Sequence, residues 1–117
     1  MTPRSLAADR LLSPDAVAEA LDALPLDPAS VLDGSPEAAI RPLAAHGSSE
    51  VGIWELTPGA VTDTESDEVF VVLAGRGTVT FADGSSIGLR PGTAVRLVAG
   101  DRTTWEITET LRKVYVA

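Results

Sequence analysis

Cysteine is absent from this 117-residue chain, which excludes disulfides, thiolate metal sites and a cysteine nucleophile. Histidine occurs once, as His46 in a Gly/Ser-rich loop, so no Ser/His/Asp triad is evident. Lysine also occurs once, as Lys113, and the other basic residues are arginines scattered along the chain. No glycine-rich phosphate loop is evident, because Gly75-Arg76-Gly77 joins two apolar runs and is not followed by a helix signal.

Positive charge is also scarce. Nine lysines and arginines face 17 aspartates and glutamates, for a net charge of −8. Nucleic acids and anionic membranes are bound through Lys and Arg, so we expect neither as a partner. The chain lacks an apolar run of membrane-spanning length and the apolar core of a signal peptide. We therefore expect a single soluble cytoplasmic domain, and the apolar fraction of 44% is enough for a modest core.

Helix signals are confined to the first third of the chain. Ser13-Pro14-Asp15 has the pattern of a helix start, and the residues after it place Val17, Leu21 and Leu24 on one face until Pro25. Asp27-Pro28 repeats the start signal and predicts one further turn. Residues 1–12 are expected to form a tail that orders in part by packing Leu11 and Leu12. The prediction is an N-terminal arm with a short helix, residues 1–36, followed by a β domain, residues 37–117.

The β domain alternates short apolar or β-branched runs with turn residues. Asp83-Gly84 is the clearest turn, because a two-residue hairpin loop needs positive φ angles. Several short strands without intervening helices predict an all-β antiparallel sandwich or barrel. The predicted strands are residues 39–44, 51–57, 68–74, 78–82, 86–89, 93–98, 103–108 and 111–116.

Two spacings in this domain are typical of a known family. Glu68 is followed after six residues by Gly75, and Gly92 is followed after five by Val98-Ala99-Gly100 and after two more by Thr103. The first spacing matches the second half of the first cupin motif, and the second matches the spacing of the second cupin motif. The chain resembles small single-domain cupins of the ureidoglycine aminohydrolase and ethanolamine-utilisation group, with matching segments at residues 52–61, 67–84, 89–100 and 104–116. The resemblance implies a cupin-type β-barrel (a double-stranded jelly roll) and a homodimer.

The metal ligands of metal-binding cupins, three histidines and one glutamate, are reduced here to Glu68. Counting back from Glu68 puts Thr64 and Thr62 at the first two histidine positions if three residues intervene, and Asp63 and Val61 if four do. Thr103 stands at the third. A threonine hydroxyl is a poor ligand for transition metals, so we expect neither a metal nor another cofactor. Asp63, Glu65 and Asp67 could form an oxygen-rich site with Glu68, although an acidic run in a turn is more often solvated.

Strand parity predicts the residues that face the barrel interior. Glu68 shares a face with Phe70 and Val72, and Thr103 shares one with Trp105 and Ile107. Trp54 lies on the same face as Leu56, and Lys113 on the same face as Tyr115. The resemblance implies that Trp54, Trp105 and Lys113 are motif positions. The predicted ligand pocket comprises Trp54, Thr62, Thr64, Glu68, Thr103, Trp105, Lys113 and Tyr115.

Glu68 has two interpretations. As the candidate catalytic residue it would be a general acid/base, with a pKa raised by burial and lowered by Lys113 or Arg96. As a structural residue it would be neutralised by Lys113 or hydrogen-bonded to Thr64 and Thr103. We favour the structural interpretation, because no nucleophile or second acid/base is evident.

The function predicted from these residues is metal-independent binding of a small polar metabolite. One alternative is an enzyme resembling ureidoglycine aminohydrolase, or another small-metabolite cupin enzyme, that uses Glu68. A second alternative is a structural or interaction dimer with a filled barrel.

Overall fold

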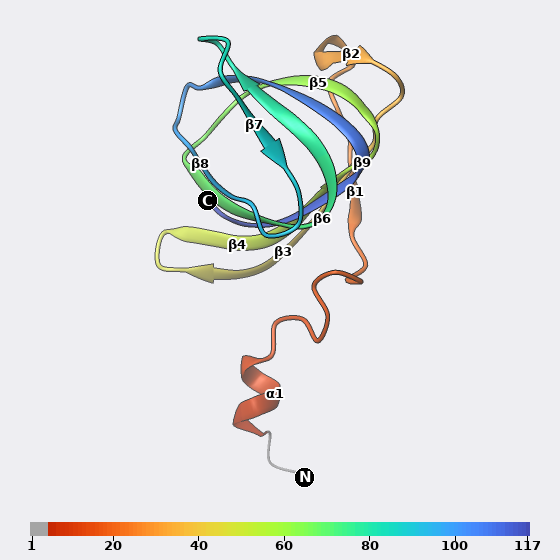
Figure 1. Cartoon of the computed structure of the whole chain (residues 1–117). Coiled ribbons are helices and arrows are strands. Elements are labelled where there is room, and N and C mark those ends of the chain that lie inside the picture. Colours follow the sequence, from red (N-terminus) through yellow and green to blue (C-terminus); the bar gives the residue numbers. More distant parts are fainter. Residues whose placement is uncertain (1–4) are drawn as a thin grey trace.

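The computed structural model describes residues 5–117, and its main feature is a nine-stranded antiparallel sheet that curls into a barrel (Figure 1). One short helix, α1 (Leu6–Arg10), and one 3-10 turn, η1 (Pro28–Ser30), accompany the sheet. The strands are β1 (Asp22–Leu24), β2 (Val31–Asp33), β3 (Ala38–His46), β4 (Ser49–Leu56), β5 (Gly59–Thr64), β6 (Glu68–Phe81), β7 (Ser86–Leu89), β8 (Ala94–Leu97) and β9 (Arg102–Val116). The architecture is the cupin-type jelly roll that the sequence predicted.

Two long strands, β6 and β9, pair with each other and connect two halves of the barrel. In one half the order is β1-β3-β4-β9-β6-β8, and it uses the end of β9 and the start of β6. In the other half the order is β2-β5-β9-β6-β7, and it uses the start of β9 and the end of β6. The two halves therefore share a continuous backbone ladder, and side chains from both meet in the barrel interior.

The interior is filled by alternate residues of these strands, as strand parity requires. Phe70 and Val72 of β6 are almost completely buried, and so are Trp105 and Ile107 of β9. Leu56 and Leu111 complete the bottom of the core with no exposed surface. The predicted inward faces of these strands are confirmed.

β6 and β9 each run without a break from one half of the barrel to the other, whereas the sequence predicted two separate strands in place of each. Irregularities in the β6–β9 register between Val72 and Gly77 bend β6 at this point. Gly75 has a φ of 93°, and a side chain on it would collide with the backbone of Thr110. The Gly75-Arg76-Gly77 segment is therefore a bulged bend within one strand. The prediction of an inter-strand turn there is wrong.

β5 is a second difference from the prediction, because residues 59–64 are in none of the predicted strands. This acidic and Thr-rich segment pairs with β9 from Gly59↔Ile107 to Thr64↔Arg102. Its apolar content is low because only one of its faces reaches the interior, where Val61 is buried. Long-range pairing with β9 thus overrides a weak local strand signal.

The predicted helix between Pro14 and Leu24 is wrong. Residues 13–21 form only a turn, in which Asp15 accepts a hydrogen bond from the Val17 amide, and residues 22–24 are strand β1. The carbonyls of Ala16 and Glu19 accept hydrogen bonds from the Arg112 guanidinium, at 3.1 and 2.8 Å. Contacts with the barrel therefore replace the helical hydrogen bonds that the local pattern favours.

α1 lies in the region of the arm predicted as a tail, and none of its residues is buried. Leu11 and Leu12, which were expected to pack, are each more than half exposed. In Figure 1 the arm leaves the barrel at β1 and carries α1 away from it. Neither α1 nor any other helix within residues 5–117 has the length and apolar character needed to cross a bilayer.

Candidate functional site

A cavity of about 930 Å³ lies in the barrel, and residues 24–30 of the arm contribute to its wall. The structure brings all eight residues of the predicted pocket to this one cavity. They come from β4, β5, β6 and β9, so the ladder of the shared strands sets their positions. Glu50, Asp63 and Glu65 also line the cavity and were not in the predicted pocket.

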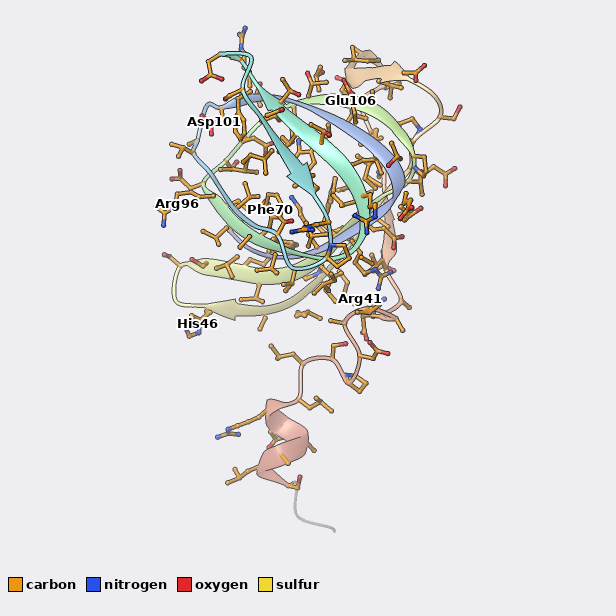
Figure 2. The ribbon with its side chains drawn as sticks, viewed as in Figure 1. Arg41, His46, Phe70, Arg96, Asp101 and Glu106 are labelled. Carbon is orange, nitrogen blue, oxygen red and sulfur yellow. The ribbon has the colours of Figure 1, made fainter. Side chains whose placement is uncertain are left out.

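Glu68 and Lys113 form an ion pair in the cavity wall. The Lys113 Nζ donates to Glu68 Oε2 at 2.6 Å, and the two side chains are only 6% and 17% exposed. Three aromatic rings surround the same ammonium, with centroids at 4.3 Å for Phe70, 4.5 Å for Trp54 and 4.8 Å for Trp105. Phe70 points into the barrel in Figure 2. Both the carboxylate and the ring faces attract the Lys113 ammonium and hold it in place.

The three rings also contact one another. The Trp105 centroid lies 5.8 Å from that of Trp54 and 5.6 Å from that of Phe70, and both pairs are tilted. Such tilted arrangements are favourable for aromatic pairs and hold the rings in place. Trp54 is only partly buried, so it presents surface to the cavity, whereas Trp105 is buried and forms the layer behind it.

Glu65 occupies a different environment in the same cavity. Its Oε1 accepts hydrogen bonds from Thr103 Oγ1 at 2.7 Å and from Trp105 Nε1 at 3.1 Å. Burial raises the pKa of Glu65 and the charge of Asp63 raises it further, while the hydrogen bond from Thr103 partly opposes the rise. Glu65 therefore keeps its proton to a higher pH than an ordinary glutamate does, because its pKa is raised.

Of the two alternatives for a structural Glu68, the structure has the pairing with Lys113 and not the hydrogen bond to Thr103, because Thr103 bonds Glu65. The sequence pattern indicates Glu65 only as part of an acidic run, either an oxygen-rich site with Glu68 or a solvated turn. Strand parity could not have located it, because it follows β5, which was not predicted. Its backbone is held by two hydrogen bonds to the 100–101 turn.

The register of β5 decides between the two alignments of the missing histidines. Val61 pairs with Trp105 and Asp63 pairs with Thr103, and both partners face the interior. The side chains of Val61 and Asp63 therefore share that face. Thr62 and Thr64 line the cavity at its rim, are exposed and point to the other face of β5, where Thr62 Oγ1 lies 3.4 Å from the Ser30 carbonyl.

Tyr115 also lines the cavity. Its hydroxyl donates to Glu50 Oε2 at 2.7 Å, and burial, together with this acidic partner, raises the pKa of Tyr115. A side chain at Gly52 would overlap the Tyr115 ring, so the glycine makes room for it. At neutral pH this tyrosine remains a protonated hydrogen-bond donor.

The donor set does not fit a transition metal. In the alignment with inward-facing residues, the positions that the resemblance implies as metal ligands hold Val61, Asp63, Glu68 and Thr103, and the one glutamate is bonded to an ammonium group. Among residues 5–117, no group of three or more His, Cys, Asp or Glu side chains is arranged to hold a metal ion. His46 lies at the tip of the β3–β4 hairpin, away from the cavity (Figure 2). Lys113 thus supplies the positive charge next to Glu68.

The curled barrel with an inward-facing site places this chain among proteins of the cupin type. Residues 43–115 match the family model of the EutQ-like cupin domain, which is more than half of the chain, and the chain therefore belongs to that family. No curated protein matches it significantly.

Solved structures show the same fold. A protein of unknown function of the DUF861 family from Pseudomonas syringae pv. tomato has a TM-score of 0.75 and 23% identity, over 85% of this chain and 44% of that one. A protein of unknown function from Rhizobium leguminosarum has a TM-score of 0.62 and 28% identity, over 68% of this chain and 78% of that one. The Clostridium difficile EutQ protein has a TM-score of 0.62 and 19% identity, over 70% and 62%. This chain therefore spans less than half of the Pseudomonas protein.

Proposed function

We propose that this protein binds a small polar metabolite in the barrel cavity without a metal ion. The observation that carries the proposal is the Lys113 ammonium, which lies 2.6 Å from Glu68, the one glutamate of the metal-ligand set that the resemblance implies. The neighbouring cavity of about 930 Å³ has room for a metabolite-sized ligand. Its size also weakens the alternative of a filled barrel with only a structural role.

The wall offers both apolar surface and hydrogen-bonding groups to a ligand. Trp54 supplies a ring, while Asp63 and Glu65 supply carboxyl oxygens. Glu65 Oε1 already accepts two hydrogen bonds, which leaves Oε2 as the atom that can contact a ligand. A few oriented polar groups in a partly apolar cavity are typical of small-molecule sites.

A thermal-shift screen against amines, amides, carboxylic acids and sugars, followed by calorimetric titration of the hits, tests the proposal. A ligand at 100 times its Kd should stabilise the fold by about 2.7 kcal/mol. Trp54→Ala should weaken binding, while Glu106→Gln, on the exposed outer surface of β9, should not. The proposal fails if no compound distinguishes the wild type from Trp54→Ala. Stoichiometric Mn, Ni, Fe or Zn in the purified protein would also contradict it.

The contrast between the two glutamates supports catalysis as a second candidate function. Glu65 has a raised pKa, which suits a general acid/base, whereas Glu68 is engaged by Lys113. An enzyme built on this site would therefore exchange protons through Glu65 and use Glu68 to orient Lys113. Turnover of a hit compound that is lost in Glu65→Gln, with binding retained, would support this second function.

A further inference from the structure

The charges that line the barrel cavity are unevenly divided. In the described part of the chain, five of the lining residues carry a carboxyl group and two carry a positive charge. The electrostatic potential inside the cavity is therefore negative, in keeping with the net charge of −8. The carboxyl groups belong to Asp27, Glu50, Asp63, Glu65 and Glu68, and the positive charges to Arg102 and Lys113.

Neither positive charge is available to a ligand inside the cavity. Lys113 donates to Glu68 at 2.6 Å and is only 6% exposed, so its ammonium is already paired. Arg102 pairs with Thr64 across β5 and β9, and both are exposed at the rim. Because side chains alternate along a strand, these two lie on the face opposite to the buried Thr103. An anionic ligand would therefore meet carboxyl groups without a cation to offset them.

Two of the five carboxyl groups can accept hydrogen bonds from a ligand. The Asp63 carboxylate accepts none from residues 5–117, and it shares the inward face of β5 with Val61. Glu65 Oε1 accepts from Thr103 and Trp105, which leaves Oε2 for a ligand. The other three are engaged by Lys113 at Glu68, by the Tyr115 hydroxyl at Glu50 and by the Ala29 amide at Asp27.

Asp63 and Glu65 are placed to attract a positive charge. Burial raises the pKa of Glu65, and the nearby charge of Asp63 raises it further. A cation beside both carboxyl groups would offset this repulsion. Two carboxyl groups are too few for a calcium ion, which takes about six or more oxygen ligands. An organic cation suits the pair better, because its N–H groups donate charge-assisted hydrogen bonds to carboxylates.

The same cavity also has apolar wall surface. Leu26, Ile40, Trp54 and Phe81 line it, and each is only partly buried by the rest of the chain. Covering the remaining apolar surface would favour binding of a ligand with an apolar body. Trp54 also offers an aromatic ring, a surface that attracts ammonium and guanidinium groups. A simple inorganic ion would leave this part of the wall uncovered.

We propose that the ligand of this cavity is a small organic cation with an apolar body. Its ammonium, amidinium or guanidinium group donates hydrogen bonds to Asp63 and to Glu65 Oε2, and its body packs on Trp54. The inference rests on the proposed function, because it requires a ligand in the cavity, and it adds the charge of that ligand. Since Lys113 offsets the charge of Glu68, the selection of a cation is left to the other two carboxyl groups.

Calorimetric titration with matched compounds tests the sign of the ligand charge. Benzamidine, benzamide and benzoate have nearly the same shape and carry a positive charge, no charge and a negative charge. Butylguanidine, butylurea and pentanoate form a second, aliphatic set. In at least one set the cation should bind at least about tenfold more tightly than the other two compounds, because charge-assisted hydrogen bonds are stronger than neutral ones.

Two variants test whether the preference for a cation comes from this site. Glu65→Gln retains an oxygen that can accept from Thr103 and Trp105 but removes the charge, and Asp63→Asn removes the other charge. Each should weaken binding of the cation about tenfold and change binding of its neutral counterpart by no more than about twofold. The matched control is Glu106→Gln, which removes the same charge from the outer surface of β9 and should leave both affinities unchanged.

The possible failures of this inference differ from those of the proposed function. A cation that binds no more tightly than its neutral counterpart in both sets overturns the inference, and so does equal weakening by Glu106→Gln. If a neutral or anionic compound binds more tightly than the cation, and Trp54→Ala abolishes that binding, the inference about charge fails while the proposed function stands. If no compound of either set binds, the inference fails, and the wider thermal-shift screen decides on the proposed function.

Discussion

Glu68 and Glu65 line the same cavity, yet their surroundings differ in charge. Glu68 lies 2.6 Å from a buried ammonium, so the pair is electrically balanced. Glu65 accepts hydrogen bonds only from the neutral groups of Thr103 and Trp105, and the nearby Asp63 adds a second negative charge. Trp105 contacts both pairs of groups, because its ring face lies near Lys113 and its Nε1–H donates a hydrogen bond to Glu65. One side of the cavity is thus a closed ion pair, and the other retains an uncompensated carboxyl.

This contrast has a physical reason in the charges around each carboxyl group. A carboxylate left behind in an apolar interior is destabilising unless a cation accompanies it. Lys113 supplies that cation from the adjacent strand, because Val72 and Lys113 are cross-strand partners and Glu68 lies on the same face of β6. Among residues 5–117, Glu65 has no such cation within hydrogen-bond distance, and its pKa is raised, so we expect a ligand beside it to change its protonation.

The largest expected effect follows from removing the cation. Lys113→Met leaves Glu68 as an unpaired carboxylate among three rings and should lower the free energy of unfolding by about 3–5 kcal/mol. Urea denaturation followed by tryptophan fluorescence measures the change. The double variant Lys113→Met/Glu68→Leu should recover most of the loss, since no buried charge remains. The exposed pair Arg76–Glu109, at 4.0 Å, is the control, and Arg76→Met should cost no more than about 0.5 kcal/mol. Equal losses for Lys113→Met and Arg76→Met would show that the Glu68 pair is not buried in solution.

A smaller effect concerns the pH dependence that Glu65 causes. Burial raises its pKa above the ordinary 4.5, so the folded state binds a proton more tightly than the unfolded state does. The contribution of Glu65 is therefore fully present below pH 4.5 and is lost as pH rises through the raised value. Relative to Glu65→Gln, the wild type should lose up to about 1.4 kcal/mol per pH unit in that window. Stability curves of the two proteins that stay parallel would show that Glu65 titrates normally.

The smallest effects distinguish the two faces of β5. Thr64→Ala changes an exposed residue and should alter stability by no more than about 0.5 kcal/mol and leave the Glu65 titration unchanged. Asp63→Asn should lower the pKa of Glu65, because it removes the negative charge that raises it. NMR titration of the Glu65 side chain measures both. A shift with Thr64→Ala in place of Asp63→Asn would mean that the register of β5 is displaced by one residue.

The residues that sequence reasoning placed correctly share a strong local pattern. Phe70 and Val72 alternate with outward residues over a long apolar run, and Trp105 and Ile107 do the same in β9. Their parity was enough to predict that Glu68, Lys113 and Tyr115 face the interior. The pairing of Glu68 with Lys113 was one of the two alternatives considered for Glu68, and the structure selects it over bonds to Thr64 and Thr103.

The misplaced residues lie where long-range contacts override local preference. The arm has a helical pattern after Ser13, but two of its carbonyls accept hydrogen bonds from the Arg112 guanidinium. Residues 22–24 pair with β3 as an edge strand. Glycine at position 75 is typical of a turn, but the pairing of β6 with β9 continues on both sides of it. Glu65 was missed for the same reason, since β5 becomes a strand only through its partner β9.

The sequence by itself determined the class of fold, the loss of the histidine ligands and the inward faces of the strands. These depend on the identity of the residues and on the alternation of side chains between the two faces of a strand, and both are local properties. The tertiary structure decided which carboxyl Lys113 neutralises, which one keeps a raised pKa, and where the arm lies. Each of these involves residues 38 or more positions apart that meet through the β9 ladder, such as Glu65 with Thr103, Glu68 with Lys113 and Ala16 with Arg112. No local pattern encodes such a meeting, because it is set by the register of a strand that pairs with three others.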